Sequence, residues 1–98
     1  MKQGFICILI NKNNTVLYVG VTSSLVERMK EHRTKKYSGS FSARYNLDKL
    51  VYWESFPSIT EAVGREKQLK GGIRQKKIEL IERANPKGVD LFAYLVYN

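Results

Sequence analysis

The sequence predicts a small α+β domain in which helices flank a three-stranded β-sheet, with the elements in the order β-β-α-β-α-α. Three observations predict this class. The chain has 98 residues, a length that suits one hydrophobic core, so residues 1–98 are expected to form one domain. Apolar residues make up 43% of the composition and 11 residues are aromatic, which argues against a disordered chain. β-branched runs bounded by turn residues alternate with two Ser-x-x-Glu capping boxes, which are start signals for strands and for helices.

The three strands are predicted where the chain is β-branched or aromatic. The first is expected over residues 5–10, an unbroken apolar run that indicates a buried strand. The turn residues at 11–14 follow it, and residues 15–20 are expected to be its hairpin partner. The third strand is expected over residues 50–56.

The two capping boxes place the starts of two helices. Ser24 and Glu27 open a helix from about 25 to 35. A second box at residues 58–61 opens a helix that ends at the glycines of residues 71–72.

The remaining segments are assigned by their helix stop signals and composition. A third helix is expected over residues 73–84, stopped by Asn85-Pro86. Residues 37–46 are rich in serine and read as an exposed loop. Residues 90–98 are apolar and aromatic, and their pattern fits either a strand or a helix.

Cysteine, histidine and apolar content exclude several classes of protein. With Cys7 and His32 as the single cysteine and histidine, the chain forms no internal disulfide and no Cys/His zinc site, which fits a reducing cytoplasm. The longest apolar run, residues 5–10, is far shorter than the about 20 residues of a membrane span. Nucleotide-binding glycine loops and H-E-x-x-H are absent from the sequence. A polyanion partner remains, with no membrane association and no obligate protein partner expected.

The positive charge is concentrated in two stretches. The chain has a formal charge of +8; residues 28–36 carry five basic side chains against Glu31, and residues 65–77 carry six against Glu66, so the rest of the chain is at −1. Two such stretches predict a nucleic-acid partner, DNA in the first instance, if they adjoin in the fold, and the alternative is that they are solvated helix faces. The candidate nucleic-acid-binding residues are Arg33, Lys35, Lys36, Arg44, Lys67, Lys70, Arg74, Lys76 and Lys77. Phe41 and Tyr45 are candidates either for stacking on unpaired bases or for packing.

Three sets of polar residues are unusual for purely structural positions. Glu66 lies on the otherwise apolar stripe of its predicted helix, so it either pairs with a cation such as Lys70 or holds a hard metal ion. Arg28 and His32 lie one helical turn apart, and they are either surface residues or a fixed charge beside a titratable ring. Tyr18 ends a predicted strand just before a glycine, where its hydroxyl faces either solvent or a site.

Between residue 4 and about residue 91, several short segments occur in an ordered series. They are Phe5-Ile-Cys-Ile-Leu, Leu17-Tyr-Val-Gly-Val-Thr22, Glu27-Arg-Met-Lys-Glu-His32, Leu50-Val-Tyr-Trp-Glu54, Arg65-Glu-Lys-Gln-Leu-Lys70, and Asn85-Pro followed by Asp90-Leu91. In this order the sequence resembles the GIY-YIG nuclease superfamily, and specifically its small stand-alone members of the UPF0213 type. The resemblance implies the same β-β-α-β-α-α fold and cleavage of phosphodiesters with one divalent metal, Mg²⁺ or Mn²⁺.

The resemblance also implies roles for individual residues. Glu66 matches the metal-binding glutamate, and one carboxylate with waters suits Mg²⁺. Arg28 matches the helix arginine that neutralises charge growing on the phosphate. Tyr18 matches the tyrosine that aligns or deprotonates the attacking water, and His32 resembles the histidine that polarises that hydroxyl or relays its proton. Asn85 matches a late asparagine that holds the substrate or the site in place.

The sequence departs from the family pattern in the first half-motif. Cys7 stands where the family has a tyrosine, so one hydrogen bond of the active site is missing or is supplied by water. Glycines and aliphatic residues at 72–73 and 88–89 replace tryptophans of other small members, which is expected to loosen substrate stacking.

Three hypotheses follow. The first is a metal-dependent endonuclease acting on single-stranded or branched DNA in repair or recombination, with Tyr18, Arg28, His32, Glu66 and Asn85 as its catalytic residues. The second is a catalytically silent nucleic-acid-binding module, which predicts salt-sensitive binding without cleavage and a gain in rate on Cys7→Tyr. The third is an interaction protein whose basic helices only solvate it.

Overall fold

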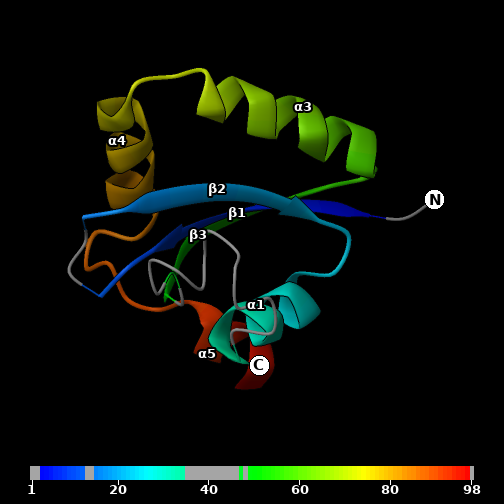
Figure 1. The fold of residues 1–98 in the computed structure, drawn as a ribbon, viewed down its shortest axis with the longest axis horizontal. Coiled ribbons are helices and arrows are strands. Elements are labelled where there is room, and N and C mark those ends of the chain that lie inside the picture. The colour runs from blue at the N-terminus through cyan, green and yellow to red at the C-terminus, as the bar shows by residue number, and fades with distance from the viewer. Residues whose placement is uncertain (1–2, 13–14, 35–46, 48, 98) are drawn as a thin grey trace.

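The computed structural model describes residues 3–12, 15–34, 47 and 49–97, and its elements follow the predicted order with one further helix at the end (Figure 1). They are β1 (Gly4–Ile10), β2 (Leu17–Thr22), α1 (Leu25–Thr34), β3 (Lys49–Phe56), α3 (Ile59–Lys70), α4 (Arg74–Ala84) and α5 (Phe92–Tyr97). The predicted α+β class is confirmed. The predicted loop at 37–46 lies outside the described residues.

The three strands form one sheet in the order β2-β1-β3, in which β1 pairs antiparallel with both neighbours. In this register Cys7 is opposite Gly20 on one side and Trp53 on the other. A shift of register between Ile8 and Leu9 interrupts the pairing with β3. Because β1 is central, its side chains are enclosed on both faces of the sheet, which explains the continuous apolar run in its sequence.

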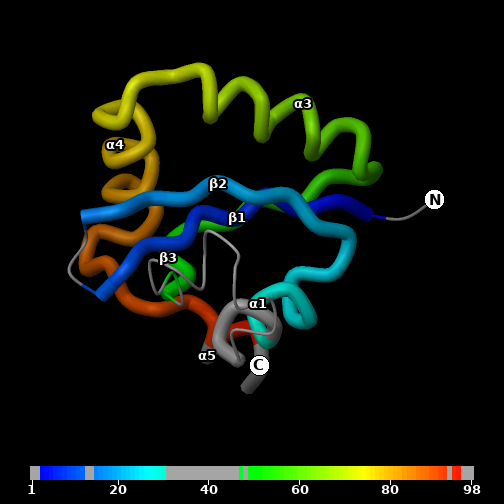
Figure 2. Tube along the Cα trace, in the orientation of Figure 1, coloured from blue at the N-terminus to red at the C-terminus, as the bar shows by residue number. Residues whose placement is uncertain are grey.

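Helices cover both faces of the sheet, with α3 and α4 on one face and α1 and α5 on the other (Figures 1 and 2). Alternate residues of β1 therefore enter two different cores. Cys7 and Leu9 pack with Leu25 and Met29 of α1, whereas even-numbered residues of β1 pack with Ile81 of α4. Burying a side chain of this size stabilises the fold by about 1.5–3 kcal/mol.

The second strand begins two residues later than predicted because Asn11 extends the turn. Its side-chain Oδ1 accepts hydrogen bonds from the backbone N–H groups of Thr15 and Val16, at 2.8 and 3.0 Å. Its amide Nδ2 donates to the Thr15 hydroxyl at 2.7 Å. Such local bonds satisfy backbone groups that would otherwise pair in the sheet, so the prediction of residues 15–20 was wrong at both ends.

The capping signal of α3 acts as predicted. The Ser58 hydroxyl accepts a hydrogen bond from the Glu61 N–H at 3.3 Å, as an N-cap does, and it donates to the Glu61 carboxylate at 3.3 Å. At the other end Gly71 donates to the Lys67 carbonyl at 2.9 Å. The next helix, α4, begins at Arg74, one residue after the predicted start.

The ambiguous C-terminal residues are helical, and Asp90 explains why. Its carboxylate accepts hydrogen bonds from the Phe92 N–H at 3.0 Å and from the Leu50 N–H at 3.2 Å, so it opens α5 and attaches that helix to β3. The Leu91 N–H adds a bond to the Leu50 carbonyl at 2.8 Å. Within the described residues, no helix combines the length and the apolar content that a membrane crossing requires.

Candidate active site

The pairing of Cys7 with Gly20 creates a gap in the side-chain layer near the edge strand β2, and the Tyr18 ring fills it. A Cβ atom added at Gly20 would lie 2.9 Å from Cε2 of Tyr18 and 3.6 Å from the Cys7 sulfur. A distance of 2.9 Å is shorter than a van der Waals contact, so the ring occupies its position because residue 20 has no side chain. Tyr18 otherwise packs against the core on the α1 side of the sheet.

One charged side chain of α3, Lys70, reaches this tyrosine, and a second, Glu66, pairs with Lys70. The Lys70 ammonium lies 5.7 Å from the centroid of the Tyr18 ring, and it also lies 3.4 Å from Oε2 of Glu66. The Glu66 side chain is only 16% exposed. Because α3 covers the opposite face from the core that Tyr18 joins, these contacts pass around the free edge of β2. Glu66 thus pairs with Lys70, which is one of the two alternatives that the sequence offered for this carboxylate.

Arg28 on α1 and Glu66 on α3 both act electrostatically on Cys7. Burial raises the pKa of the Cys7 thiol to about 11; the positive charge of Arg28 and a backbone hydrogen bond with Gly20 oppose the rise in pKa, and the negative charge of Glu66 adds to it. The thiol is therefore protonated near neutral pH. Cys7 is 1% exposed and packs in the core on the α1 side of the sheet.

A hollow of about 360 Å³ opens beside the tyrosine. It is lined by Leu17, Tyr18, Val19, Lys70 and Lys77. Two ammonium groups and a phenol around one hollow suit an anionic ligand such as a phosphodiester.

Asn85 has its side chain bonded to the backbone. It is 6% exposed, its Nδ2 donates to the carbonyls of Val51 and Val89 at 3.0 and 2.9 Å, and its Oδ1 accepts from the Val89 N–H at 3.1 Å. These bonds attach the segment after α4 to β3. The contacts of Asn85 are thus with backbone of β3 and of that segment, and not with Tyr18, Arg28 or Glu66.

Several predicted site residues lie outside the described part of the chain. His32 and Arg33 belong to α1, but their side chains are not described. Lys35, Lys36, Phe41, Arg44 and Tyr45 also lie outside the described residues.

The comparison with known proteins bears on the whole arrangement. Residues 3–79 match the model of the GIY-YIG catalytic domain. The chain belongs to the GIY-YIG family. It is therefore a member of a nuclease family, which acts on nucleic acids and generally depends on divalent metals.

Relatives align with most of the length of this chain. The chain is 32% identical over 87 residues to a UPF0213 protein of Syntrophus aciditrophicus, covering 89% of this chain and 98% of that protein. It is 34% identical over 86 residues to a UPF0213 protein of Staphylococcus haemolyticus, covering 84% and 98%. The solution NMR structure of a UPF0213 protein from Bacillus halodurans is also similar, with a TM-score of 0.52, 29% identity, and coverage of 88% of this chain and 86% of that one. The resemblance seen in the sequence is confirmed.

For a GIY-YIG domain the carboxylate set is small. Among the described residues, no three or more His, Cys, Asp or Glu side chains lie close enough together to hold a metal ion by themselves. Glu66 is a single, mostly buried carboxylate beside the Tyr18 hollow. One hard oxygen ligand completed by water and phosphate oxygens is a donor set that fits Mg²⁺ or Mn²⁺.

The basic residues of this GIY-YIG domain are divided between its two faces. The first basic stretch begins on α1 and the second runs along α3 and α4, on the opposite face of the sheet. Lys67 is exposed on α3, Arg74 lines a hollow beside the β1–β2 hairpin, and Lys76 and Lys77 line a groove between α3 and α4. In the part of the chain that the structure describes, α1 is therefore not a neighbour of α3 or α4 on one face of the sheet.

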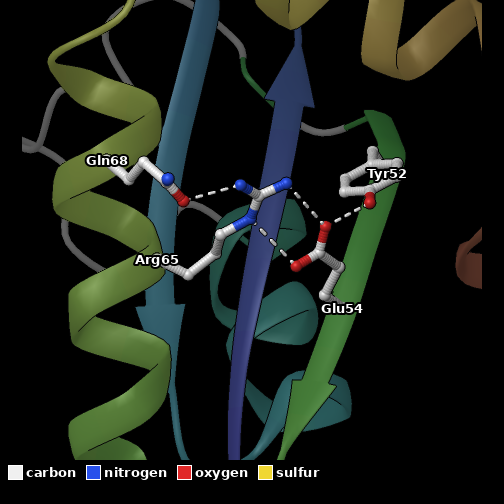
Figure 3. A network of polar contacts seen from close by, with 4 residues as sticks. All are labelled: Tyr52, Glu54, Arg65 and Gln68. Atoms are coloured by element: carbon white, nitrogen blue, oxygen red, sulfur yellow. Dashed lines mark hydrogen bonds and ion pairs between the residues drawn. The ribbon is translucent and has the colours of Figure 1, made fainter.

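The sequence reasoning missed a polar network on the α3 face of the sheet (Figure 3). Arg65 reaches across β1 and donates from Nε and Nη2 to the two carboxylate oxygens of Glu54, at 3.1 and 3.2 Å. Its Nη1 donates to Oε1 of Gln68 at 2.7 Å, and the Tyr52 hydroxyl donates to Glu54. Glu54 shares a face with Tyr52 by alternation along β3, so a carboxylate in an aromatic strand was the signal available.

Proposed function

We propose that this chain is a metal-dependent endonuclease that hydrolyses phosphodiester bonds of DNA, single-stranded or branched, in repair or recombination. The observation that supports the proposal is that Lys70 contacts both Glu66 and the Tyr18 ring beside a hollow that Tyr18, Lys70 and Lys77 line. Arg28 and Glu66 both act electrostatically on Cys7, which is opposite Gly20 in the sheet. In the resemblance to the family, Tyr18, Arg28 and Glu66 match its motif residues. Tyr18 and Arg28 lie on the consecutive elements β2 and α1, whereas Glu66 comes from α3, much later in the chain.

Each residue has a distinct role in the proposed reaction. Arg28 stabilises the charge that grows on the phosphate, because its guanidinium stays protonated and offers several donors. Glu66 holds the divalent cation, which supplies Lewis-acid stabilisation of the phosphoryl oxygens. Tyr18 orients the attacking water and accepts its proton while passing its own to His32. The new phosphorus–oxygen bond forms as the bond to the leaving sugar oxygen breaks, and that oxygen takes a proton from solvent.

Lys70 and Asn85 support this arrangement in different ways. Lys70 places positive charge on the face of Tyr18, 5.7 Å from the ring centroid, where a phosphate next to the cleaved bond would meet it. Glu66 would hold the divalent cation, and Lys70, which is 3.4 Å from Glu66, would then be a cation available to that phosphate. Asn85 holds the site in place indirectly, through the backbone of β3.

The proposal is tested by cleavage of labelled single-stranded, duplex and branched DNA at low salt with Mg²⁺, Mn²⁺ or EDTA. We expect metal-dependent cleavage that falls by about 10²-fold or more in Glu66→Ala and Arg28→Ala, while DNA binding survives. The matched control is Glu82→Ala, which removes an exposed carboxylate on α4 and should cut at the wild-type rate. Wild-type rates in both site variants would show that these residues are not the catalytic set.

A second candidate, a silent nucleic-acid-binding module, is favoured by one observation. Cys7, at the position of the first motif tyrosine, is buried and protonated and cannot supply a phenol to the site. This candidate predicts salt-dependent binding with no cleavage in either metal. A gain in rate on Cys7→Tyr would identify the missing phenol as the defect.

A further inference from the structure

A groove of about 590 Å³ runs between α3 and α4, on the helical layer opposite α1. Its α3 wall includes Arg65 and Leu69, its α4 wall includes Lys76 and Arg83, and the connection at residues 71–73 closes one end. The volume lies within the range of about 300–1,000 Å³ that small-molecule sites occupy, so it suits one or two nucleotides and is too small for a duplex.

The groove is positively charged. Lys76, Lys77 and Arg83 line it against one carboxylate, Glu79, whereas the charge of Arg65 is matched by Glu54. The Lys77 ammonium donates to the Gly72 carbonyl at 3.3 Å, which holds it at the α3–α4 connection. Fixed cations along a groove attract a phosphate backbone by charge, without reading its sequence.

The groove and the hollow beside Tyr18 are neighbours, because Lys77 lines both. A strand whose phosphate lies at Tyr18 therefore meets Lys70 first, then Lys77, and then the cations of α4. The path leads away from the site between α3 and α4, from the end closed by residues 71–73 towards Arg83.

The groove also has apolar walls that a duplex would not use. Ile73 is 66% exposed at the closed end, and Leu69 and Leu80 line the sides. In a duplex the base faces are covered by stacking, whereas an unpaired strand can lay its bases on such a surface and its phosphates on the lysines. Charge and apolar contact in one narrow groove thus favour an unpaired strand.

We propose that the α3–α4 groove binds the unpaired strand on one side of the cleaved bond, so that the substrate carries a single-stranded arm. The inference rests on the proposed function, since it takes Tyr18 as the point where the strand is cut. It adds a substrate class, a direction for the strand, and Lys76, Lys77 and Arg83 as the residues that hold it.

The first test compares two double charge reversals of equal size. Lys76→Glu with Arg83→Glu alters the groove, whereas Lys12→Glu with Lys87→Glu alters two exposed lysines that do not line it. Binding of a labelled single-stranded 20-mer and of a blunt 20-bp duplex is measured in EDTA over a series of salt concentrations. We expect the groove variant to lose roughly tenfold or more in affinity for the single strand. The slope of log affinity against log salt concentration should become shallower by about 1.4, because two phosphate contacts are lost.

The second test locates the strand. Cys7 is the single cysteine and is buried, so Ile73→Cys carries one accessible thiol. We expect the single-stranded 20-mer to slow maleimide labelling of this thiol, and the duplex to leave the labelling rate unchanged. Ile59→Cys is the control, because residue 59 is 37% exposed at the far end of α3, and its labelling should not respond to either DNA.

Equal loss of single-strand binding in the two charge-reversal variants would overturn the groove as the strand path. Equal protection of the thiols at residues 73 and 59 from maleimide would do the same. Such a result combined with metal-dependent cleavage that needs Glu66 would leave the proposed function standing. Binding confined to the groove without any cleavage would instead reject the nuclease and retain the strand path.

Discussion

The absence of a side chain at residue 20 is what allows Tyr18 to lie over the centre of the candidate site. Gly20 is opposite Cys7 in the sheet, and the tyrosine ring occupies the space that a Cβ would take. The atom nearest to an added Cβ belongs to the Tyr18 ring and not to the backbone, so a substitution at residue 20 should move the ring rather than the strand. Gly4 differs, because a Cβ there would lie 2.7 Å from the Ile59 Cα and would push α3 off the sheet.

We therefore expect Gly20→Ala to displace Tyr18 and to lower the cleavage rate by about 10²-fold, the usual cost of a misplaced catalytic group. The variant should remain folded by circular dichroism. Gly64→Ala is the control: nothing lies within 4 Å of its added Cβ, so the rate should not change. Its free energy of unfolding should rise by about 0.5–1 kcal/mol, because alanine favours the helix. An unchanged rate in Gly20→Ala would argue against a catalytic Tyr18.

At the level of elements, the contact of α3 with β3 depends on Arg65 and Glu54. The two parallel hydrogen bonds of the guanidinium cross β1 and fix the helix to the far strand (Figure 3). Glu66 follows Arg65 directly, so the same bonds set the rotation of α3 that turns Glu66 towards Tyr18. Both side chains are about a quarter exposed, at 28% and 24%, so water only partly screens the pair.

Removing the guanidinium fork should destabilise the fold even when the positive charge remains. We expect Arg65→Lys to lower the free energy of unfolding in urea by about 1.5–3 kcal/mol, because lysine cannot make the bidentate contact and leaves Glu54 and Gln68 short of donors. Lys67→Arg on the exposed side of α3 is the control and should change it by less than about 0.5 kcal/mol. Equal stability of the two variants would contradict the role given to this contact.

At the level of the whole molecule, the two helical layers enclose the sheet within a radius of gyration of 12.7 Å, close to the about 13 Å of a compact chain of this length. Cys7 lies at the centre of one layer. Burial raises its pKa from 9.0 to about 11, so the folded protein holds this proton more tightly than the unfolded chain. Tyr52 behaves alike, since burial and its hydrogen bond to Glu54 raise its pKa from 10.0 to about 12.

Stability should therefore fall at alkaline pH. Below pH 9.0 both states keep the Cys7 proton and the stabilisation is complete; as pH rises to about 11 the unfolded chain loses the proton first, and stability is lost. The loss from Cys7 is on the order of 2–3 kcal/mol. Urea unfolding with reductant at pH 7, 9 and 11 measures the free energy of unfolding. Cys7→Ala should remove the part of its fall between pH 9 and 11 that is due to Cys7, while the part due to Tyr52 remains. Parallel pH profiles of the two proteins would be inconsistent with a buried thiol as the source.

The elements themselves could largely be predicted from local sequence. The β-branched run at 5–10 and the capping box at 58–61 act over a few residues, and both are found where expected. The start of β2 and the helical state of residues 92–97 could not be predicted from local sequence. The first depends on hydrogen bonds that the Asn11 side chain accepts within the turn. The second depends on hydrogen bonds that the Asp90 carboxylate accepts from Phe92 and from Leu50, a strand residue forty positions earlier.

For this protein, sequence alone determined the class of fold and the family, because local propensities and motif order are properties of the chain itself. The site residues Tyr18, Arg28 and Glu66 stay a prediction. Only the tertiary structure decided that Glu66 pairs with Lys70 and that Lys70 lies over the Tyr18 ring, that Arg65 binds Glu54, and that α1 and α3, where the two basic stretches begin, cover opposite faces of the sheet. Such contacts depend on strand register and on which face each helix covers, and these are set by the packing of two cores at once.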